Sequence, residues 1–189
     1  MKKICVFCGS SSGSNPIYSQ MAEELGKILA GNSLELVYGG GDVGLMGIIS
    51  RTVISSGGHV TGIIPELLHG KVPHKELSEL RIVKDMHERK ALMYNLSDGF
   101  ICLPGGIGSL EEVLEAFTWL QLGYHRKPVC IINSGGYYNH LIKQLEYMVS
   151  EGFLKQFHFD TLIIKDDFTG IIEEMRSIDL QYKRKWNHE

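Results

Sequence analysis

An anion-binding pattern and two carboxylates stand side by side in FICLPGGIGSLEEVLEAF, which spans residues 100–117. The glycines of its loop are Gly105, Gly106 and Gly108. They allow close backbone approach and positive φ angles before a helix that we expect to begin near Ser109. Free N–H groups and the helix dipole at such a start favour an anion such as phosphate, and the Ser109 hydroxyl can add a donor. Yet Glu111 and Glu112 follow within one turn, which places negative charge beside a loop suited to anions.

The same stretch has a purely structural alternative. Ser109 could be an N-cap whose capping box is completed by Glu112, because the spacing S-x-x-E fits that motif. Along the helix, the apolar spacing predicts a core-facing stripe of Leu110, Val113, Leu114, Phe117 and Leu120. We then expect Glu112 on a second face, together with Ala116 and Trp119.

A second candidate is the cationic pair Arg89 and Lys90 in DMHERKALMYNL, residues 85–96. Asp85 is followed three residues later by a glutamate, which predicts an N-cap at Asp85 and a helix after it. The residues that share a helical face with the two cations are Met86, Met93 and Tyr94. The cations could snorkel from the flank of this partly apolar face to solvent. Alternatively they reach an anionic ligand, since the planar fork of arginine suits bidentate phosphate contact.

Two further loops are rich in glycine and serine. In GGGDVGLMG, the residues Gly39, Gly41 and Gly44 match the dinucleotide fingerprint G-x-G-x-x-G, and Glu66 follows at about the expected distance. The match leaves open an NAD-dependent oxidoreductase. It follows the second strand instead of the first, however, and no set of residues for hydride chemistry accompanies it. The loop GSSSGSN, residues 9–15, could contact a phosphate or a ribose, or be a plain turn.

Short β-rich runs alternate with longer amphipathic stretches along the chain. The expected strands lie near residues 3–8, 34–38, 59–64, 80–84, 99–103, 128–133 and 162–165. The expected helices lie near residues 16–30, 43–56, 86–97, 109–123, 137–150 and 168–178. Near-continuous apolar strands such as GFICL and PVCIIN are typical of parallel sheets, which are buried on both faces. The pattern predicts a single-domain α/β fold over residues 1–189, Rossmann-like and doubly wound, with a mostly parallel sheet flanked by helices and a polar tail at about 180–189.

This fold would bring together the loop segments that follow the expected strands. Ligands of an open parallel sheet bind beyond the carboxyl ends of its strands. Five segments each follow an expected strand: CGSSSGSNP, GGGDVGLMG, PELLHGKVPH, DMHERK and PGGIGSLEE. If the strands are parallel, all five converge on one rim, and we expect the functional site there.

The bulk composition excludes several classes of protein. The net charge is −3 and both signs are interspersed, so we expect neither a nucleic-acid partner nor a membrane-binding face. No apolar run approaches 18 residues and the N-terminus has no signal-peptide pattern, which predicts a cytoplasmic protein. Cys5 and Cys8 form a C-x-x-C, but residues three apart in a strand point to opposite faces, so we expect no metal there.

Three of these stretches resemble the signatures of one family. PGGIGSLEE is similar to the P-G-G-x-G-T-x-x-E signature of the LOG-type proteins, named after the plant "lonely guy" cytokinin-activating enzymes. GGGDVGLMG and MHERK resemble the other two signature stretches of the family, in the same order. The resemblance runs from ICVFCGSSSG to the helix that ends near Ser150. Ser109 replaces the usual threonine and keeps its hydroxyl, whereas Lys71 stands where many members have an acidic residue.

The resemblance implies a cytokinin riboside 5′-monophosphate phosphoribohydrolase. Such an enzyme hydrolyses the N-glycosidic bond of AMP, or of an N6-substituted AMP, to the free base and ribose 5-phosphate. The resemblance implies that Glu112 and Arg89 are catalytic. The substrate-binding residues that it implies are Lys90, Gly105, Gly106, Gly108, Ser109 and Glu111. On the loops that we expect at the same rim, we also predict substrate contacts from Gly9, Ser10, Gly40 and Met86. It also implies a homodimer with the site near the subunit contact, and no cofactor or metal. Many members carry the label lysine decarboxylase, but we find no lysine placed to hold pyridoxal phosphate.

This activity would account for a glycine loop beside glutamates. A nucleoside monophosphate is anionic only at its phosphate, whereas C1′ of its ribose becomes positive as the base departs, as in glycosidase transition states. We therefore expect backbone amides of residues 105–109 to bind the phosphate while Glu112 faces the sugar. Glu111 would bind ribose hydroxyls, and Arg89 would anchor charge on the phosphate or on Glu112. A non-catalytic nucleotide or cofactor carrier on the same fold is the main alternative.

Overall fold

The computed structural model describes residues 1–71 and 77–180. The predicted polar tail therefore lies outside the described residues except for Leu180, and so does part of the expected loop segment PELLHGKVPH. Within the described ranges, no helix is long and apolar enough to cross a membrane.

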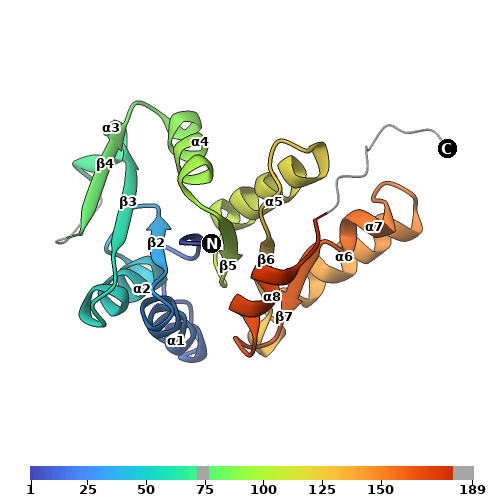
Figure 1. The fold of residues 1–189 in the computed structure, drawn as a ribbon, viewed down its shortest axis with the longest axis horizontal. Helices are drawn as coiled ribbons and strands as arrows, with labels where there is room; N and C mark the ends of the chain where they lie inside the picture. Colours follow the sequence, from blue (N-terminus) through green and yellow to red (C-terminus); the bar gives the residue numbers. More distant parts are fainter. Residues whose placement is uncertain (72–76, 181–189) are drawn as a thin grey trace.

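Seven strands form one sheet in the order β4-β3-β2-β1-β5-β6-β7, and every neighbouring pair is parallel (Figure 1). The strands are β1 (Lys3–Phe7), β2 (Glu35–Tyr38), β3 (Val60–Pro65), β4 (Glu79–Val83), β5 (Gly99–Cys102), β6 (Val129–Ile132) and β7 (Leu162–Lys165). Each lies where the sequence predicts a strand. The predicted doubly wound, Rossmann-like α/β fold is confirmed, and the sheet is parallel throughout the described chain instead of mostly parallel.

The six predicted helices are all present. They are α1 (Ile17–Gly31), α2 (Gly44–Ser55), α4 (Met86–Leu96), α5 (Ile107–Leu122), α6 (Asn139–Ser150) and α8 (Ile171–Ser177). Three short elements were not predicted, namely α3 (Glu66–His69), η1 (Ser134–Gly136) and α7 (Gln156–Phe159). Four residues or fewer make about one helical turn, which is too short for a hydrophobic period to show.

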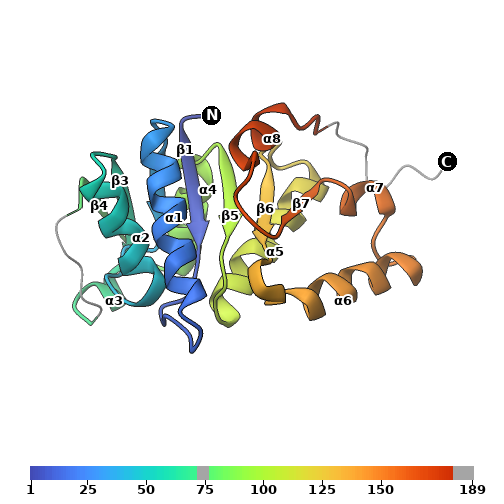
Figure 2. The same ribbon diagram turned by 90° about the horizontal axis from the view of Figure 1, so that it is seen from below.

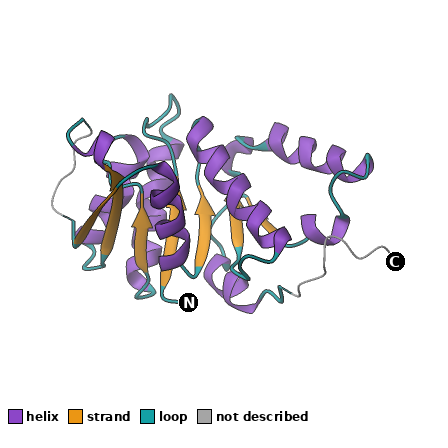
Figure 3. Cartoon of the chain, turned by 90° about the horizontal axis from the view of Figure 1, so that it is seen from above, coloured by secondary structure: helices purple, strands orange, loops and turns teal. Residues whose placement is uncertain are grey.

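Helices cover both faces of the sheet, as Figure 3 shows by the strands lying between layers of helix. One core cluster packs α1, α2 and α8 on one face, and the other packs α4, α5 and α6 on the opposite face. Cys8 belongs to the first cluster and Cys5 to the second, so the C-x-x-C cysteines do point to opposite faces. Both thiols are buried and free.

The order of the strands creates a switch point at β1. The chain adds β2, β3 and β4 on one side of β1 and then returns to the other side with β5, β6 and β7. The loops after β1 and β5 therefore diverge from adjacent strand ends, which is where ligands bind in such sheets. In Figure 2 the strand ends point downward, and the segments that follow β1, β3, β5 and β6 lie along the lower edge.

Candidate active site

The glycine-rich loop after β5 leads into α5, which begins at Ile107 with Gly106 as its N-cap. The helix thus starts two residues earlier than predicted, and Ser109 lies inside its first turn. No side chain caps the helix, so the capping box of Ser109 and Glu112 is wrong. The first backbone N–H groups of a helix have no intrahelical partners. At the start of α5 they lie in an exposed segment, because Gly106, Ile107 and Gly108 are all exposed.

The three glycines of this loop serve different purposes. Gly105 is required by packing, because a Cβ there would lie 2.9 Å from the amide nitrogen of Gly9 and 2.7 Å from Cβ of Ser109. A Cβ at Gly106 or Gly108 would meet nothing within 4 Å, so the space above them is open. None of the three has a positive φ, and that part of the prediction is wrong. Positive φ angles occur instead in the loop after β2.

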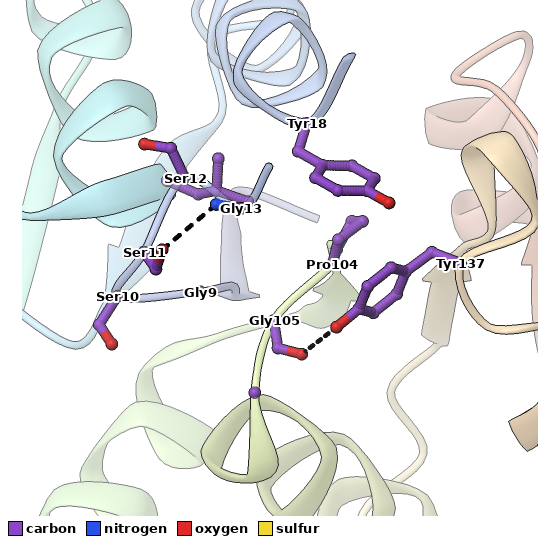
Figure 4. A pocket seen from close by; sticks show the side chains of 11 residues that line it. Gly9, Ser10, Ser11, Ser12, Gly13, Tyr18, Pro104, Gly105 and Tyr137 are labelled. Carbon is purple, nitrogen blue, oxygen red and sulfur yellow. Dashed lines mark hydrogen bonds between the residues drawn. The ribbon is translucent and has the colours of Figure 1, made fainter. Parts of the chain in front are cut away.

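A cavity of about 250 Å³ lies at the switch point, between the loops that follow β1 and β5. Figure 4 shows the two loops facing each other, with the rings of Tyr18 and Tyr137 beside them. The cavity is lined by Gly9, Ser10, Ser11, Ser12, Gly13, Tyr18, Leu45, Pro104, Gly105, Gly106 and Tyr137. The structure thus brings the sequence-predicted residues Gly9, Ser10, Gly105 and Gly106 together around one space.

Arg89 and Glu112 form a salt bridge of 3.0 Å between α4 and α5, and each side chain is 11% exposed. The core-facing residues of α5 are Ser109, Glu112, Val113, Ala116, Phe117 and Leu120, so the buried stripe is rotated toward Glu112 relative to the prediction. Burial raises the pKa of the Glu112 carboxyl, and the Arg89 guanidinium only partly offsets that rise. The Arg89 Nε also donates to the Ile63 carbonyl at 3.3 Å. The alternative that Arg89 extends to bulk solvent is therefore wrong.

Lys90 is also paired and not snorkelling, since it is only 9% exposed. Its ammonium forms salt bridges to Glu111 and Glu115 on α5. The hydroxyl of Tyr94, one turn along α4, donates its single proton to the Glu115 carboxylate at 2.7 Å, and the Glu112 carbonyl oxygen lies 3.2 Å away as a weaker second acceptor. The network ties α4 to α5 behind the Arg89–Glu112 pair. Glu115 was missed in the sequence, although its place one turn after Glu111 and Glu112 could have indicated it.

The start of α4 agrees with its sequence. Asp85 caps the helix by accepting from the amides of His87 and Glu88, each at 2.9 Å. The Glu88 carboxylate accepts from the Lys84 amide at 2.8 Å. This capped first turn fixes where the next turn presents its two cations. Met86, a predicted substrate contact, is 42% exposed at the helix start.

The loop after β2 connects the cavity to the Arg89–Glu112 pair. A Cβ at Gly39 would collide with the Arg89 guanidinium, so this glycine lets Arg89 lie against the loop. Gly44, at φ +53°, packs against the backbone of Ser10. A Cβ at Gly40, whose φ is +79°, would lie 3.3 Å from the backbone nitrogen of Ile63 in β3. Gly39 and Gly44 of the dinucleotide fingerprint thus have a packing explanation that needs no dinucleotide.

The predicted site residues therefore fall into two adjoining groups. Around the cavity lie Gly9, Ser10, Gly105 and Gly106, with Ser109 buried against Gly105. Beside them, across the loop after β2, lie the cations of α4 and the glutamates of α5. Glu112 does not line the cavity itself. Tyr18 of α1 and Tyr137 were both missed in the sequence. Tyr137 lies in NSGGYYN, which follows the sixth strand and so obeys the rule that selected the other five segments.

Comparison with known proteins identifies the relatives of this chain. The family model described as "Possible lysine decarboxylase" matches residues 46–175. The probable cytokinin riboside 5′-monophosphate phosphoribohydrolase LOGL2 of Oryza sativa subsp. japonica is 43% identical over 194 residues, with 100% of this chain and 80% of that protein covered. The chain belongs to the LOG family. The LOG5 enzyme of Arabidopsis thaliana, which carries the name cytokinin riboside 5′-monophosphate phosphoribohydrolase, is 52% identical over 155 residues, or 82% of this chain and 68% of that protein.

Solved structures share the fold of this LOG family member at lower identity. The molybdenum cofactor binding protein of Rippkaea orientalis is 22% identical with a TM-score of 0.70, covering 94% of this chain and 97% of that one. The molybdenum cofactor carrier protein of Chlamydomonas reinhardtii is 20% identical with a TM-score of 0.68, covering 93% and 96%. At these identities the likeness concerns the fold alone.

The description of the family model as a possible lysine decarboxylase raises the question of pyridoxal phosphate. A lysine that forms a Schiff base must be able to lose its proton, and desolvation or neighbouring cations assist that. Burial does lower the pKa of Lys90, but its hydrogen bonds to Glu111 and Glu115 outweigh burial and raise the pKa overall. Lys90, the lysine of the LOG signature stretch, therefore does not fit the role.

Proposed function

We propose that this protein hydrolyses the N-glycosidic bond of AMP and of N6-substituted AMP, releasing the free base and ribose 5-phosphate. The observation that carries the proposal is the buried Glu112 carboxylate, held by Arg89 and separated from the glycine-lined cavity by one loop. Relatives that are 43% and 52% identical are named as phosphoribohydrolases of this type.

The phosphate end of the substrate would lie at the start of α5. Amides of residues 105–109 would donate to the phosphoryl oxygens, helped by the helix dipole. The open space over Gly106 and Gly108 supports this placement, because any larger side chain there would project into it. Gly9 and Ser10 would contact the ligand from the opposite wall of the cavity.

The sugar end would lie toward Glu112. Its carboxylate would orient or deprotonate the attacking water and stabilise the positive charge that develops at C1′. A raised pKa suits this role, since a general base works best when its pKa approaches the operating pH. Arg89 does not transfer the proton, because the pKa of a guanidinium exceeds about 12. It would instead hold the carboxylate in place.

The remaining contacts are assigned by their place around these two ends. The Glu111 side chain is 50% exposed and would turn toward the ribose hydroxyls. Its salt bridge to Lys90 would limit how far it moves. Met86 and Gly40 lie at the same rim and would border the base or the sugar. Ser109 would support the phosphate loop through its contact with Gly105.

We also propose that the protein is a homodimer. Ile107 at the start of α5 is 81% exposed and Met86 at the start of α4 is 42% exposed, so apolar side chains stand in solvent beside the site. A second copy of the chain would cover them. Light scattering after size-exclusion chromatography tests this, and a monomer at micromolar concentration would contradict it.

The cytoplasmic location stays a prediction from the sequence.

The deciding experiment is chromatography of the products after incubation with AMP and, separately, with isopentenyl-AMP. We expect free base and ribose 5-phosphate in equal amounts from at least one of them. A carrier would instead bind AMP tightly and release no adenine, and that result would overturn the proposal. Comparing the two rates shows whether the enzyme is general or prefers a substituted base.

A further inference from the structure

The glycine-rich loop after β5, which would bind the phosphate, has several successive carbonyl groups that could weaken anion binding. A carbonyl oxygen is the negative end of the peptide dipole, so any that faced the cavity would repel a phosphate. In the structure, the carbonyls of Leu103, Pro104 and Gly105 each accept a hydrogen bond from another part of the chain. That of Gly106 accepts from the Leu110 amide, as the helix begins.

Two of these donors are neighbouring tyrosines from a different loop. The Tyr137 hydroxyl donates to the Gly105 carbonyl at 2.6 Å, and the Tyr138 hydroxyl donates to the Leu103 carbonyl at 2.8 Å (Figure 4 shows the first bond). Between them, the Gly9 amide donates to the Pro104 carbonyl at 3.1 Å. Three successive peptide groups are thus held in orientation by groups outside the loop.

The turn that carries the tyrosines is itself rigidly built. Asn133, at the end of β6, accepts from the Tyr138 amide at 2.7 Å and donates to the Asn139 side chain at 2.9 Å. Gly135 and Gly136 have φ angles of +64° and +72°, which glycine adopts without strain.

The two tyrosine rings are fixed by packing. Tyr137 packs edge-on against Tyr138 at 4.8 Å and against Tyr18 at 5.4 Å between ring centroids. Tyr138 is buried, whereas Tyr137 lines the cavity. Edge-to-face contacts of this kind stabilise a particular ring orientation. The hydroxyl positions are therefore set before any ligand binds.

We propose that Tyr137 is a positioning residue for phosphate binding. By holding the carbonyl of Gly105, it turns the Gly106 amide of the same peptide group toward the anion. Tyr138 supports the loop one step back, because the peptide group that it holds ends in Pro104 and has no N–H to offer. The inference rests on the proposed function, since it concerns the same phosphate end of the substrate. It assigns a function to NSGGYYN that neither the glycine loops nor the catalytic pair explains.

Tyr137→Phe tests this because it removes one hydroxyl and keeps the ring against Tyr18 and Tyr138. We expect the KM for AMP and the dissociation constants of ribose 5-phosphate and inorganic phosphate to rise roughly three- to tenfold, the effect of one lost hydrogen bond. The turnover number should stay within about twofold, because the bond acts on binding. The dissociation constant of adenosine, which has no phosphate, should not change.

Matched variants separate positioning from general damage to the fold. Tyr147→Phe, in an exposed tyrosine of α6, should behave as wild type in every assay. Tyr138→Phe should lower the melting temperature, because Tyr138 is buried, and should weaken phosphate binding less than Tyr137→Phe, because the peptide group that Tyr138 holds has no N–H. If Tyr137→Phe binds phosphate ligands as wild type does, or weakens adenosine as much as AMP, the inference is overturned.

The same measurements distinguish this inference from the proposed function. A wild-type protein that binds ribose 5-phosphate but does not hydrolyse AMP contradicts the function only, and the phosphate series still tests the tyrosines. A wild-type protein that binds none of the phosphate ligands contradicts the inference directly.

Discussion

Two cation–carboxylate contacts join α4 to α5, and adjacent residues make them. Arg89 pairs with Glu112, and Lys90 pairs with Glu111 and Glu115. Both cations are almost fully buried, but their partners are not alike. The Glu112 side chain is 11% exposed, whereas that of Glu111 is 50% exposed. One helix turn therefore presents one shielded carboxylate and one that reaches solvent.

The two contacts also differ in which partner has a raised pKa, which is the carboxyl of Glu112 in the first contact and the ammonium of Lys90 in the second. Burial raises the pKa of Glu112 despite the attraction of Arg89, so this carboxylate is more basic than an ordinary glutamate. At Lys90 the carboxylates outweigh burial and raise the pKa of the ammonium, so this cation is held in its charged form. The difference indicates that the first pair is suited to proton transfer and the second to holding the helices and Glu111 in place.

The largest expected effect comes from breaking the chemistry of the first pair alone. Glu112→Gln keeps the shape of the side chain but removes its basicity, so we expect the turnover number for AMP to fall about 10²-fold or more. The dissociation constant of AMP should change by less than about threefold. Glu146→Gln, an exposed glutamate of α6, is the matched control and should leave kinetics unchanged. An active Glu112→Gln enzyme would remove Glu112 from the mechanism.

A smaller loss is expected when the first cation is changed in shape but not in charge. Arg89→Lys loses the fork that reaches both Glu112 and the Ile63 carbonyl, so we expect kcat/KM to fall roughly 10- to 100-fold, the range for lost bonds to charged groups. Arg81→Lys offers a control at an Arg–Glu contact whose arginine side chain is 40% exposed. Equal kinetics for both lysine variants and wild type would mean that any cation suffices at position 89.

The second contact should respond through binding and stability more than through turnover. Lys90→Met leaves Glu111 and Glu115 without their shared cation, so we expect the KM for AMP to rise severalfold and the free energy of unfolding to fall by roughly 1–2 kcal/mol. This corresponds to a melting temperature lower by about 2–8 °C. Lys165→Met, at the contact of β7 with Glu174, is the control for stability alone. A loss of turnover as large as that of Glu112→Gln would erase the distinction between the two contacts.

The sequence was sufficient to predict the architecture because its signals are local. Apolar strand runs, helical periods and punctuating glycines located all seven strands and the six longer helices. The convergence of loops on one rim followed from parallel strands alone. Pairing across helices is different in kind. Arg89 and Lys90 lie more than twenty residues from their partners, and no spacing rule connects positions so far apart.

The predicted faces of α5 show where periodicity misleads. A stripe drawn through the most apolar residues placed Glu112 off the core, whereas the helix buries Glu112 and leaves Leu110 and Leu114 half-buried. A charged residue is placed on the surface by default, because burial of a charge is costly unless it is paired. Its partner here comes from α4, so only the three-dimensional arrangement shows that the burial is stabilised. Tyr137 and Tyr138, which lie between η1 and α6, were missed for the same reason, since their acceptors are carbonyls on a distant loop.

The smallest predicted effect links the two contacts through the pH dependence of turnover. Glu112 must be ionised to act as a base, so the turnover number should fall with decreasing pH at a pH above the ordinary glutamate pKa of about 4.3. The negative charge of Glu111 raises the pKa of Glu112, and the positive charge of Lys90 lowers it. Glu111→Gln should therefore move the acid limb to lower pH, and Lys90→Met should move it to higher pH.

Turnover numbers measured at saturating AMP across the acid range, for wild type and both variants, check these directions. The ionisation of the AMP phosphate is common to the three profiles and cancels in their comparison. Because one variant removes a negative charge and the other a positive one, opposite shifts mean that both charges act on the field at Glu112. Shifts in the same direction would instead point to a common structural change between α4 and α5, and coincident profiles would mean that the second contact is electrically isolated from the first.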